Sequence, residues 1–242
     1  MRFELNPALD EDAIAASLAS AGRVQVRDFL RPEAAEALLK FLVESADWRH
    51  VLNAGDNVYE IGCDQLEVMD EEQRRTLDSK SDQAAAHGFQ FRFDTIRVPD
   101  QESDRAAQAT LLTDFASFLS APEQVDWFHR VTGNDSIDFA DAQATRYRNG
   151  AFLTTHDDAV EGKSRHFAYV LNLTSDWRAD WGGLLFFPGD RSTRVEALVP
   201  HFNLLNLFAV GQPHGVSQVA SYAPRPRISV TGWLRSRDGS TG

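Results

Sequence analysis

The sequence predicts an α+β, mainly β fold: a double-stranded β-helix, or jelly roll, with N-terminal helices packed on its major sheet. Helical patterns dominate up to about residue 135, whereas short β-type runs follow one another after Ser136 with no helix between them. Many short strands separated by turn residues are typical of an antiparallel sandwich or barrel. We find no linker, low-complexity tract or internal repeat in the sequence. We therefore expect one domain over residues 1–242, with a helical part at about 1–135 and a jelly-roll core at about 136–236.

The expected helices of the first part are marked by residues that favour helix ends. Gly22 follows the first helical pattern, and Pro32 stands where the first turn of a helix tolerates proline. A later segment is amphipathic, with Leu111, Leu112 and Phe115 on its apolar face. We expect helices over residues 10–21, 32–43, 70–86, 104–120 and 122–131.

Strands are expected where apolar and polar residues alternate. The clearest alternation covers residues 89–98, where aromatic side chains on one face and polar side chains on the other predict a half-buried strand. Residues 48–62 are mixed in character, with a turn at 53–57. The remaining strands are expected over residues 24–30, 137–147, 166–173, 183–187, 194–198, 202–208, 215–219 and 228–234.

Composition and charge exclude several classes of partner. Apolar residues make up 43% of the chain and aromatic residues 10%, which is ample for a sizeable core. The formal net charge of −12 argues against binding nucleic acid, which needs basic surface to neutralise phosphates, and against an anionic membrane surface. Small molecules and neutral to basic polypeptides are left as partners.

The single cysteine, Cys63, leaves neither a disulfide framework nor a thiolate metal cluster and favours a reducing compartment. The first residues lack the apolar stretch of a signal peptide, and no apolar run approaches the roughly 18 residues that a membrane helix needs. We expect a soluble, cytoplasmic protein.

A candidate metal site begins with His156 and Asp158, two residues apart after an apolar run. On an extended strand, residues i and i+2 point to the same face, so both side chains would project together and Asp157 would face away. A His-x-Asp pair is common by chance, and a third ligand is needed. His214 is the best candidate for it, with His201 as its rival.

Two histidines and one carboxylate would form the ligand face of a non-haem Fe(II) oxygenase. Three such ligands hold Fe(II) on one side of an octahedron and leave the other positions for a cosubstrate and O2. A closed four-ligand site could not do this.

Arg227 begins a second informative segment, in which Ser229 and Thr231 share its face of an alternating strand. This strand would send a guanidinium into the barrel, where an unpaired charge is costly, so we expect it to meet a carboxylate. A guanidinium aided by a hydroxyl group is a natural clamp for a dicarboxylate. In the alternative interpretation, Arg227 points to solvent and pairs with a surface acid.

Taken together, these segments resemble the Fe(II)/2-oxoglutarate dioxygenase superfamily, specifically its prolyl-hydroxylase-like branch. The similarity extends over about residues 141–235, and the Asn-Leu-Thr-x-Asp-Trp and Trp-Gly-Gly-Leu-Leu-Phe-Phe segments are most similar to protein-modifying prolyl hydroxylases of oxygen-sensing and ribosomal type. The matching positions are 146–147, 150, 156, 158, 169–173, 176–177, 181–187, 214–216 and 227–233.

The resemblance implies that His156, Asp158 and His214 ligate Fe(II), and that no catalytic residue is needed beyond this metal site. It implies 2-oxoglutarate as cosubstrate together with O2, and ascorbate is a further candidate cofactor.

For the cosubstrate, the resemblance implies that Arg227 binds the distal carboxylate of 2-oxoglutarate and that Tyr147 donates a hydrogen bond to it. Ser229 and Thr231 are weaker candidates for the same cluster. Trp233 matches an aromatic residue near the active-site wall, although it could equally belong to the core.

Differences from the motifs of two related subgroups make those subgroups less favoured. Collagen-type prolyl 4-hydroxylases usually have lysine at the position of Arg227, and nucleic-acid demethylases have a second arginine that this segment lacks. We expect hydroxylation of a prolyl residue in a protein or peptide, with release of succinate and CO2. Hydroxylation of free proline or another small metabolite is an alternative, and a non-catalytic cupin-like metal-binding module is an alternative of another class. The edge strands of a jelly roll allow a homodimer, but the sequence does not determine the oligomeric state.

Overall fold

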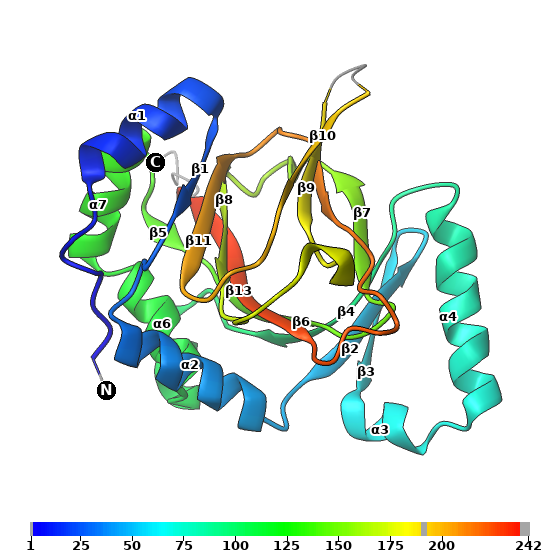
Figure 1. Cartoon of the computed structure of the whole chain (residues 1–242). Helices are drawn as coiled ribbons and strands as arrows, with labels where there is room; N and C mark the ends of the chain where they lie inside the picture. The colour runs from blue at the N-terminus through cyan, green and yellow to red at the C-terminus, as the bar shows by residue number, and fades with distance from the viewer. Residues whose placement is uncertain (1, 190–192, 238–242) are drawn as a thin grey trace.

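The computed structural model describes residues 2–189 and 193–237, which form helices packed around a single curled sheet (Figure 1). The helices are α1 (Glu11–Ala21), α2 (Pro32–Glu44), α3 (Cys63–Val68), α4 (Glu71–Ala85), α5 (Glu102–Gln108), α6 (Leu111–Leu119), α7 (Pro122–Thr132) and the short 3-10 helix η1 (Ala179–Trp181). The strands of the first part are β1 (Arg23–Val26), β2 (Arg49–Ala54), β3 (Asn57–Gly62) and β4 (Phe91–Arg97). Those of the second part are β5 (Phe139–Ala140), β6 (Gln143–Tyr147), β7 (Phe152–His156), β8 (Arg165–Asn172), β9 (Leu185–Pro188), β10 (Val195–Leu198), β11 (Leu204–Ala209), β12 (His214–Val216) and β13 (Arg227–Arg235).

The sheet is antiparallel and follows the order β1-β11-β8-β13-β6-β4-β7-β12-β9-β10. Strand β4 is where it turns, because residues 94–97 pair with β6 and residues 91–92 pair with β7. The sheet therefore folds into two walls, β11-β8-β13-β6 on one side and β7-β12-β9-β10 on the other. The predicted jelly-roll fold class is confirmed.

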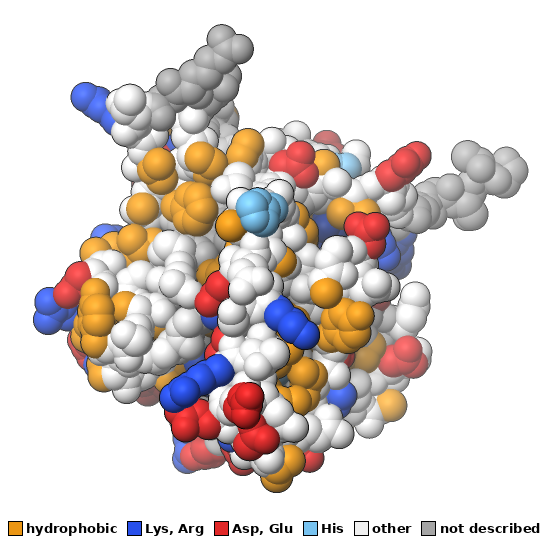
Figure 2. All heavy atoms as spheres, turned by 90° about the vertical axis from the view of Figure 1, so that its right-hand side faces the viewer, with side chains coloured by type: hydrophobic (Ala, Val, Ile, Leu, Met, Phe, Trp, Pro, Cys, Tyr) orange, Lys and Arg blue, Asp and Glu red, His pale blue; other side chains and the backbone are white. Residues whose placement is uncertain are grey.

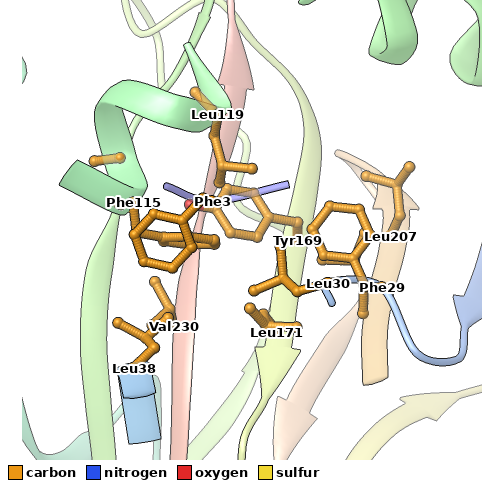
Figure 3. Packing of buried hydrophobic residues seen from close by; sticks show 14 of the residues in the cluster. Phe3, Phe29, Leu30, Leu38, Phe115, Leu119, Tyr169, Leu171, Leu207 and Val230 are labelled. Atoms are coloured by element: carbon orange, nitrogen blue, oxygen red, sulfur yellow. The ribbon is translucent and has the colours of Figure 1, made fainter. Parts of the chain in front are cut away.

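Helices α1, α2, α6 and α7 cover the outer face of the first wall, and this interface forms the main hydrophobic core. Leu171 of β8 and Val230 of β13 pack there against residues from the helices, among them Leu38 and Phe115 (Figure 3). Strand alternation then turns the neighbouring side chains of the same strands to the inner face. The core thus decides which residues of β8 and β13 face the space between the walls.

Helix ends follow the predicted signals. The Asp10 carboxylate accepts a hydrogen bond from the Ala13 backbone N–H at 3.0 Å, and Gly22 ends α1 in the left-handed region with φ of 69°. Gly133 ends α7 in the same way, with φ of 66°.

Several expected boundaries are wrong. The helix expected over 104–120 is two helices, because Ala109 adopts φ of 47° and Thr110 caps α6 by accepting from the Thr113 N–H at 3.2 Å. The strand expected over 137–147 is interrupted where the Asp141 carboxylate accepts from the Trp233 N–H at 2.7 Å. Residues 49–62 form a β2–β3 hairpin where the sequence shows only a mixed pattern around a turn.

Strand β4 also departs from expectation, since its polar face is buried more deeply than its aromatic face. Arg92 and Asp94 are 5% and 1% exposed, whereas Phe91 and Phe93 are only partly buried. Arg92 forms ion pairs with Asp78 and Asp82 of α4, at 3.0 and 3.1 Å. These carboxylates belong to another element, so the alternation of residues within β4 could not predict that Arg92 is buried.

Helix α4 stands at the side of the molecule that Figure 2 presents. Only Ser81 of its residues is buried, and charged side chains are numerous on this surface. No helix in the described residues is long and apolar enough to cross a membrane.

Candidate metal centre and its cavity

A cavity of about 380 Å³ lies between the two walls of the sheet. One wall contributes Val170 of β8 and Arg227 of β13, and the other contributes His156 of β7, Leu185 of β9 and His214 of β12. All the residues that the sequence predicts for the metal and the cosubstrate line this one space.

The side chains of His156, Asp158 and His214 converge in the cavity. The Asp158 carboxylate lies between the imidazoles, with Oδ1 at 3.2 Å from His156 Nε2 and Oδ2 at 3.3 Å from His214 Nε2. The three candidate donor atoms all lie within 4.8 Å of one another. Asp158 and His214 are buried, and His156 is partly exposed to the cavity.

Backbone contacts set the orientation of both imidazoles. His156 Nδ1 lies 3.1 Å from the carbonyl oxygen of Thr154, and His214 Nδ1 lies 2.9 Å from that of Gln212. A carbonyl can only accept, so each Nδ1 donates its hydrogen. Each Nε2 faces the Asp158 carboxylate and donates to it in this structure, and it is the nitrogen that would ligate a metal ion once that hydrogen is released.

A β-bulge explains why His156 points inward. His214 pairs with His156 and Val216 pairs with Leu153, so three steps along β7 match two steps along β12. Both Leu153 and His156 line the cavity as a result. Strict alternation from Leu153 would have turned Thr155 inward instead.

The predicted geometry of the His-x-Asp pair is wrong, although the two side chains do meet. Strand β7 ends at His156, and Asp158 lies beyond it with φ of 63°. This left-handed turn brings the carboxylate back to the imidazoles. Asp157 is exposed and accepts a hydrogen bond from the Ala159 N–H at 3.1 Å, and His201 is exposed and stands outside the cluster.

The local charges favour an ionised Asp158. Burial alone would raise the pKa of this carboxyl, but hydrogen bonds from His156 and His214 outweigh burial and hold the pKa below its usual value. Two imidazole nitrogens and one carboxylate oxygen fit Fe(II). Cys63 lies elsewhere, beside Arg146, and offers no thiolate to this site.

Arg227 enters the cavity from β13 and is 1% exposed. Its Nη1 donates to the Gly183 carbonyl at 2.9 Å and its Nη2 to the Asn172 side-chain oxygen at 3.1 Å, while Nε has no partner. Burial lowers the pKa of this guanidinium to about 10, with Tyr147 acting in the opposite direction. Arg227 therefore points inward, and the alternative of a solvent-facing ion pair is wrong.

Tyr147 lies against Arg227, whose guanidinium carbon is 5.4 Å from the centre of the phenol ring. Burial raises the pKa of Tyr147, so its hydroxyl stays protonated and can donate. The Ser229 hydroxyl is 2.9 Å from that of Thr145, and Thr231 lines the cavity farther along β13. The Ser229 hydroxyl therefore already has a hydrogen-bond partner, which the sequence pattern did not predict.

Sequence reasoning did not single out the residues that hold Arg227. Asn172 and Gly183 lie in the two segments that are most similar to prolyl hydroxylases, but no local pattern predicts that they accept hydrogen bonds from Arg227. Only the pairing of β8 with β13 brings Asn172 beside the arginine.

Aromatic side chains of the β4 segment form one side of the cavity. Phe89, Phe91 and Phe93 follow one another with ring centroids 5.7 and 5.5 Å apart. At one end of this row Phe93 stacks on Tyr147 at 5.2 Å, and at the other Phe89 lies 5.4 Å from the His156 ring. Phe89 is 50% exposed, so it stands at the mouth of the cavity.

Trp233, predicted for the active-site wall or the core, lines the cavity. The guanidinium of Arg165 lies 3.5 Å from the centre of its ring, and Nη1 of Arg165 donates to the Asp158 backbone carbonyl at 3.3 Å. Arg165 thus adds a cation close to the candidate metal ligands.

Residues 142–235 match the model of the 2OG-Fe(II) oxygenase superfamily, and they include the His156, Asp158 and His214 cluster together with Arg227. This part of the chain belongs to the 2OG-Fe(II) oxygenase superfamily. The family predicted from the sequence is confirmed.

Known relatives agree with a prolyl-hydroxylase-like oxygenase. The chain is 33% identical over 115 residues to the prolyl 3-hydroxylase OGFOD1 of Mus musculus, a match that covers 45% of this chain and 21% of the relative. The chain thus spans about a fifth of the length of that curated relative.

Solved structures show the same fold over nearly the whole chain. A prolyl-4-hydroxylase of Pseudomonas putida has a TM-score of 0.57 at 21% identity, covering 94% of this chain and 99% of the other. A Trichoplax adhaerens prolyl hydroxylase, in complex with a peptide of hypoxia inducible factor, has a TM-score of 0.63 at 16% identity, covering 93% and 89%. The similarity in fold therefore extends to the N-terminal helices.

Proposed function

We propose that this chain is an Fe(II)- and 2-oxoglutarate-dependent dioxygenase that hydroxylates a prolyl residue of a protein or peptide, with release of succinate and CO2. One observation carries the proposal. A single cavity holds the converging donor atoms of His156, Asp158 and His214 together with the buried guanidinium of Arg227.

In this proposal His156, Asp158 and His214 hold Fe(II). Bound Fe(II), with 2-oxoglutarate, supplies the activation of O2 that hydroxylation of an unactivated C–H bond requires. The protein contributes two imidazoles oriented by backbone carbonyls and an ionised carboxylate between them. A bound metal ion would replace the hydrogens that the two Nε2 atoms donate to Asp158.

Arg227 and Tyr147 hold the distal carboxylate of 2-oxoglutarate in the same proposal. A carboxylate would give the buried guanidinium the charged partner that no described residue supplies, and the Tyr147 hydroxyl would donate a second hydrogen bond. Ser229 and Thr231 remain weaker candidates for this cluster, because the Ser229 hydroxyl already has Thr145 as a partner.

The substrate is proposed from the remaining walls of the cavity and from the names of the relatives. Phe89, Phe91 and Trp233 offer apolar ring faces near the candidate metal ligands, which suit the pyrrolidine ring of proline. One relative is named a prolyl 3-hydroxylase and one related structure contains a peptide. A prolyl residue within a polypeptide is therefore favoured over free proline and over the cupin-like module.

The test measures conversion of 2-oxoglutarate to succinate by the Fe(II)-loaded protein, with proline-containing peptides and with free proline as separate additions. We expect turnover to be stimulated by peptides, and to be lost in His156→Ala and in Asp158→Ala. His201→Ala is the matched control, because this exposed histidine lies outside the cluster and should retain activity. Full turnover in both cluster variants would contradict the site, and stimulation by free proline alone would replace the polypeptide substrate by a small molecule.

Cytoplasmic location accompanies this proposal as a prediction. The edge strands of the sheet allow a homodimer, and ascorbate is a candidate cofactor. The position of hydroxylation on the ring is read directly from the product by NMR spectroscopy of the modified peptide.

A further inference from the structure

The guanidinium of Arg227 is held by two oxygen atoms that carry no formal charge. One belongs to the Gly183 backbone and the other to the Asn172 side chain. A buried arginine normally meets a carboxylate, because an unpaired charge is costly away from water. Among the described residues, no carboxylate oxygen lies within 4.0 Å of this guanidinium. The cation is oriented but not neutralised.

The Asn172 side chain can present only its oxygen to Arg227. Its amide nitrogen donates to the backbone carbonyls of Leu204 at 3.2 Å and Val170 at 3.4 Å, so the oxygen must point the other way. Asn172 is 1% exposed and ends β8, where it is paired with Leu204 on one side and with Ser229 on the other. The strand ladder therefore fixes the acceptor in place.

The Gly183 carbonyl is fixed by its loop. Gly183 adopts φ of 62° and donates its N–H to the Ser217 carbonyl at 3.0 Å, while Trp177 Nε1 donates to the neighbouring Gly182 carbonyl at 2.8 Å. A Cβ at position 183 would lie 3.1 Å from a Val219 methyl group and 3.5 Å from Arg227 Cδ. Glycine thus permits both the backbone turn and the close approach to the arginine.

We infer that Asn172 is a positioning residue for 2-oxoglutarate, which together with the Gly183 carbonyl orients Arg227 through neutral acceptors and leaves its charge for the cosubstrate. The inference rests on the proposed function. Asn172 acts through Arg227 and need not touch the cosubstrate. An aspartate at position 172 would hold the guanidinium at least as firmly. It would also neutralise the guanidinium and so compete with the distal carboxylate of 2-oxoglutarate.

The experiment titrates 2-oxoglutarate into Fe(II)-loaded protein without O2 and follows binding by the charge-transfer absorption and by calorimetry. We expect Asn172→Asp to weaken binding about tenfold or more, the scale of one lost charge-assisted interaction. Asn172→Ala should weaken it less, by about threefold, because the charge stays available and only the orientation is lost. Fe(II) affinity should stay unchanged in both variants, since neither touches the metal ligands.

Asn206→Asp is the matched control. Asn206 is a buried asparagine on the adjacent strand β11, and its side-chain oxygen accepts from Gln25 and not from Arg227. We expect its 2-oxoglutarate affinity to equal that of the parent protein. Equal affinity in Asn172→Asp and the parent would overturn the inference.

A double-mutant cycle decides the matter if Asn172→Asp does not fold. Asn172→Ala should weaken 2-oxoglutarate binding in the parent but have no further effect in Arg227→Lys, since the two residues act as one unit. Additive losses would overturn the positioning role. Failure of the parent protein itself to bind 2-oxoglutarate would instead refute the proposed function.

Discussion

The imidazoles of His156 and His214 lie side by side across β7 and β12, with ring centroids 4.3 Å apart, and each donates Nδ1–H to the carbonyl two residues before it. The backbone of each imidazole's own segment therefore orients its ring. No side chain has to be placed for this purpose, so the two nitrogen donors are oriented as soon as β7 and β12 pair.

We expect Asp158→Asn to abolish stoichiometric Fe(II) binding, because an amide oxygen offers no charge to the metal ion. Metal content after anaerobic loading measures the effect. Asp157→Asn is the control, since Asp157 is exposed beside the same strand end and should load like the parent. Loss of iron in the Asp157 variant with retention in the Asp158 variant would reverse the assignment.

Arg227→Ala should raise the KM for 2-oxoglutarate without weakening the fold of the free protein. The arginine is buried without a carboxylate partner, so relief of a desolvated charge offsets the cost of the void and of the two acceptors left without a donor. Melting curves with and without 2-oxoglutarate should show that the variant loses only the stabilisation given by the cosubstrate. An unchanged KM would remove Arg227 from the binding site.

The same guanidinium predicts a pH dependence. Burial lowers the pKa of Arg227 to about 10, so the charged form is present at neutral pH and is lost as the pH rises through about 10. We expect 2-oxoglutarate affinity to be flat around neutrality and to fall on the alkaline side of that value. Anaerobic titrations at increasing pH, over the range in which the fold persists, measure it. A fall that begins near pH 7 would point to another group.

Asp94→Asn should destabilise the fold by about 3–5 kcal/mol, because it removes the charge of the buried carboxylate that one histidine and two arginines share. Asp94 accepts from His50 at 2.9 Å, from Arg146 at 2.9 Å and from Arg148 at 2.7 Å. Burial raises the pKa of Asp94, but the hydrogen bonds from His50 and Arg148 outweigh burial and keep the pKa below its usual value.

The lowered pKa of Asp94 determines the pH range over which this carboxylate stabilises the fold. A carboxyl group with a lowered pKa stabilises the fold above its unfolded pKa and loses this contribution as the pH falls through the folded value. The difference between parent and Asp94→Asn in urea unfolding should therefore be full above about pH 4 and shrink below it. Asp100→Asn, an exposed partner of Arg235, should change stability by no more than about 1 kcal/mol at any of these pH values.

Gly215→Ala should lower both stability and Fe(II) affinity. A Cβ there would lie 2.8 Å from the Leu153 carbonyl oxygen and 2.8 Å from the Phe186 ring, so β12 would have to shift away from β7. Overpacking of this kind costs about 1–3 kcal/mol. Gly88→Ala is the control, since nothing lies within 4 Å of a Cβ at that position. Chemical unfolding and metal titration of both variants measure the difference.

Phe89→Ala should weaken binding of a prolyl peptide and spare 2-oxoglutarate, because Phe89 stands at the mouth of the cavity beside His156. The loss of one aromatic contact corresponds to about a tenfold rise in peptide KM. Tyr59→Ala is a matched control, with 51% exposure against 50% for Phe89 and no part in the cavity lining. A peptide KM that moves equally in both variants would contradict this role.

Features that depend on local backbone geometry could be predicted from the sequence. Alternation placed Arg227, Ser229 and Thr231 on one face of β13, and all three line the cavity. Gly22 marked the end of α1 because a helix end is capped within a few residues. Family motifs named the metal and cosubstrate candidates, whose roles stay predictions until they are measured.

Features that depend on a neighbouring strand could be seen only in the folded chain. The bulge opposite β12 turns His156 inward. The left-handed backbone at Asp158 then directs its carboxylate toward the imidazoles, whereas the sequence predicted an extended strand at this residue. Charged partners from α4 and β6 buried the polar face of β4, and the β8–β13 register set Asn172 beside Arg227. Register, bulges and buried ion pairs belong to pairs of distant segments, and a periodic pattern within one segment carries no information about them.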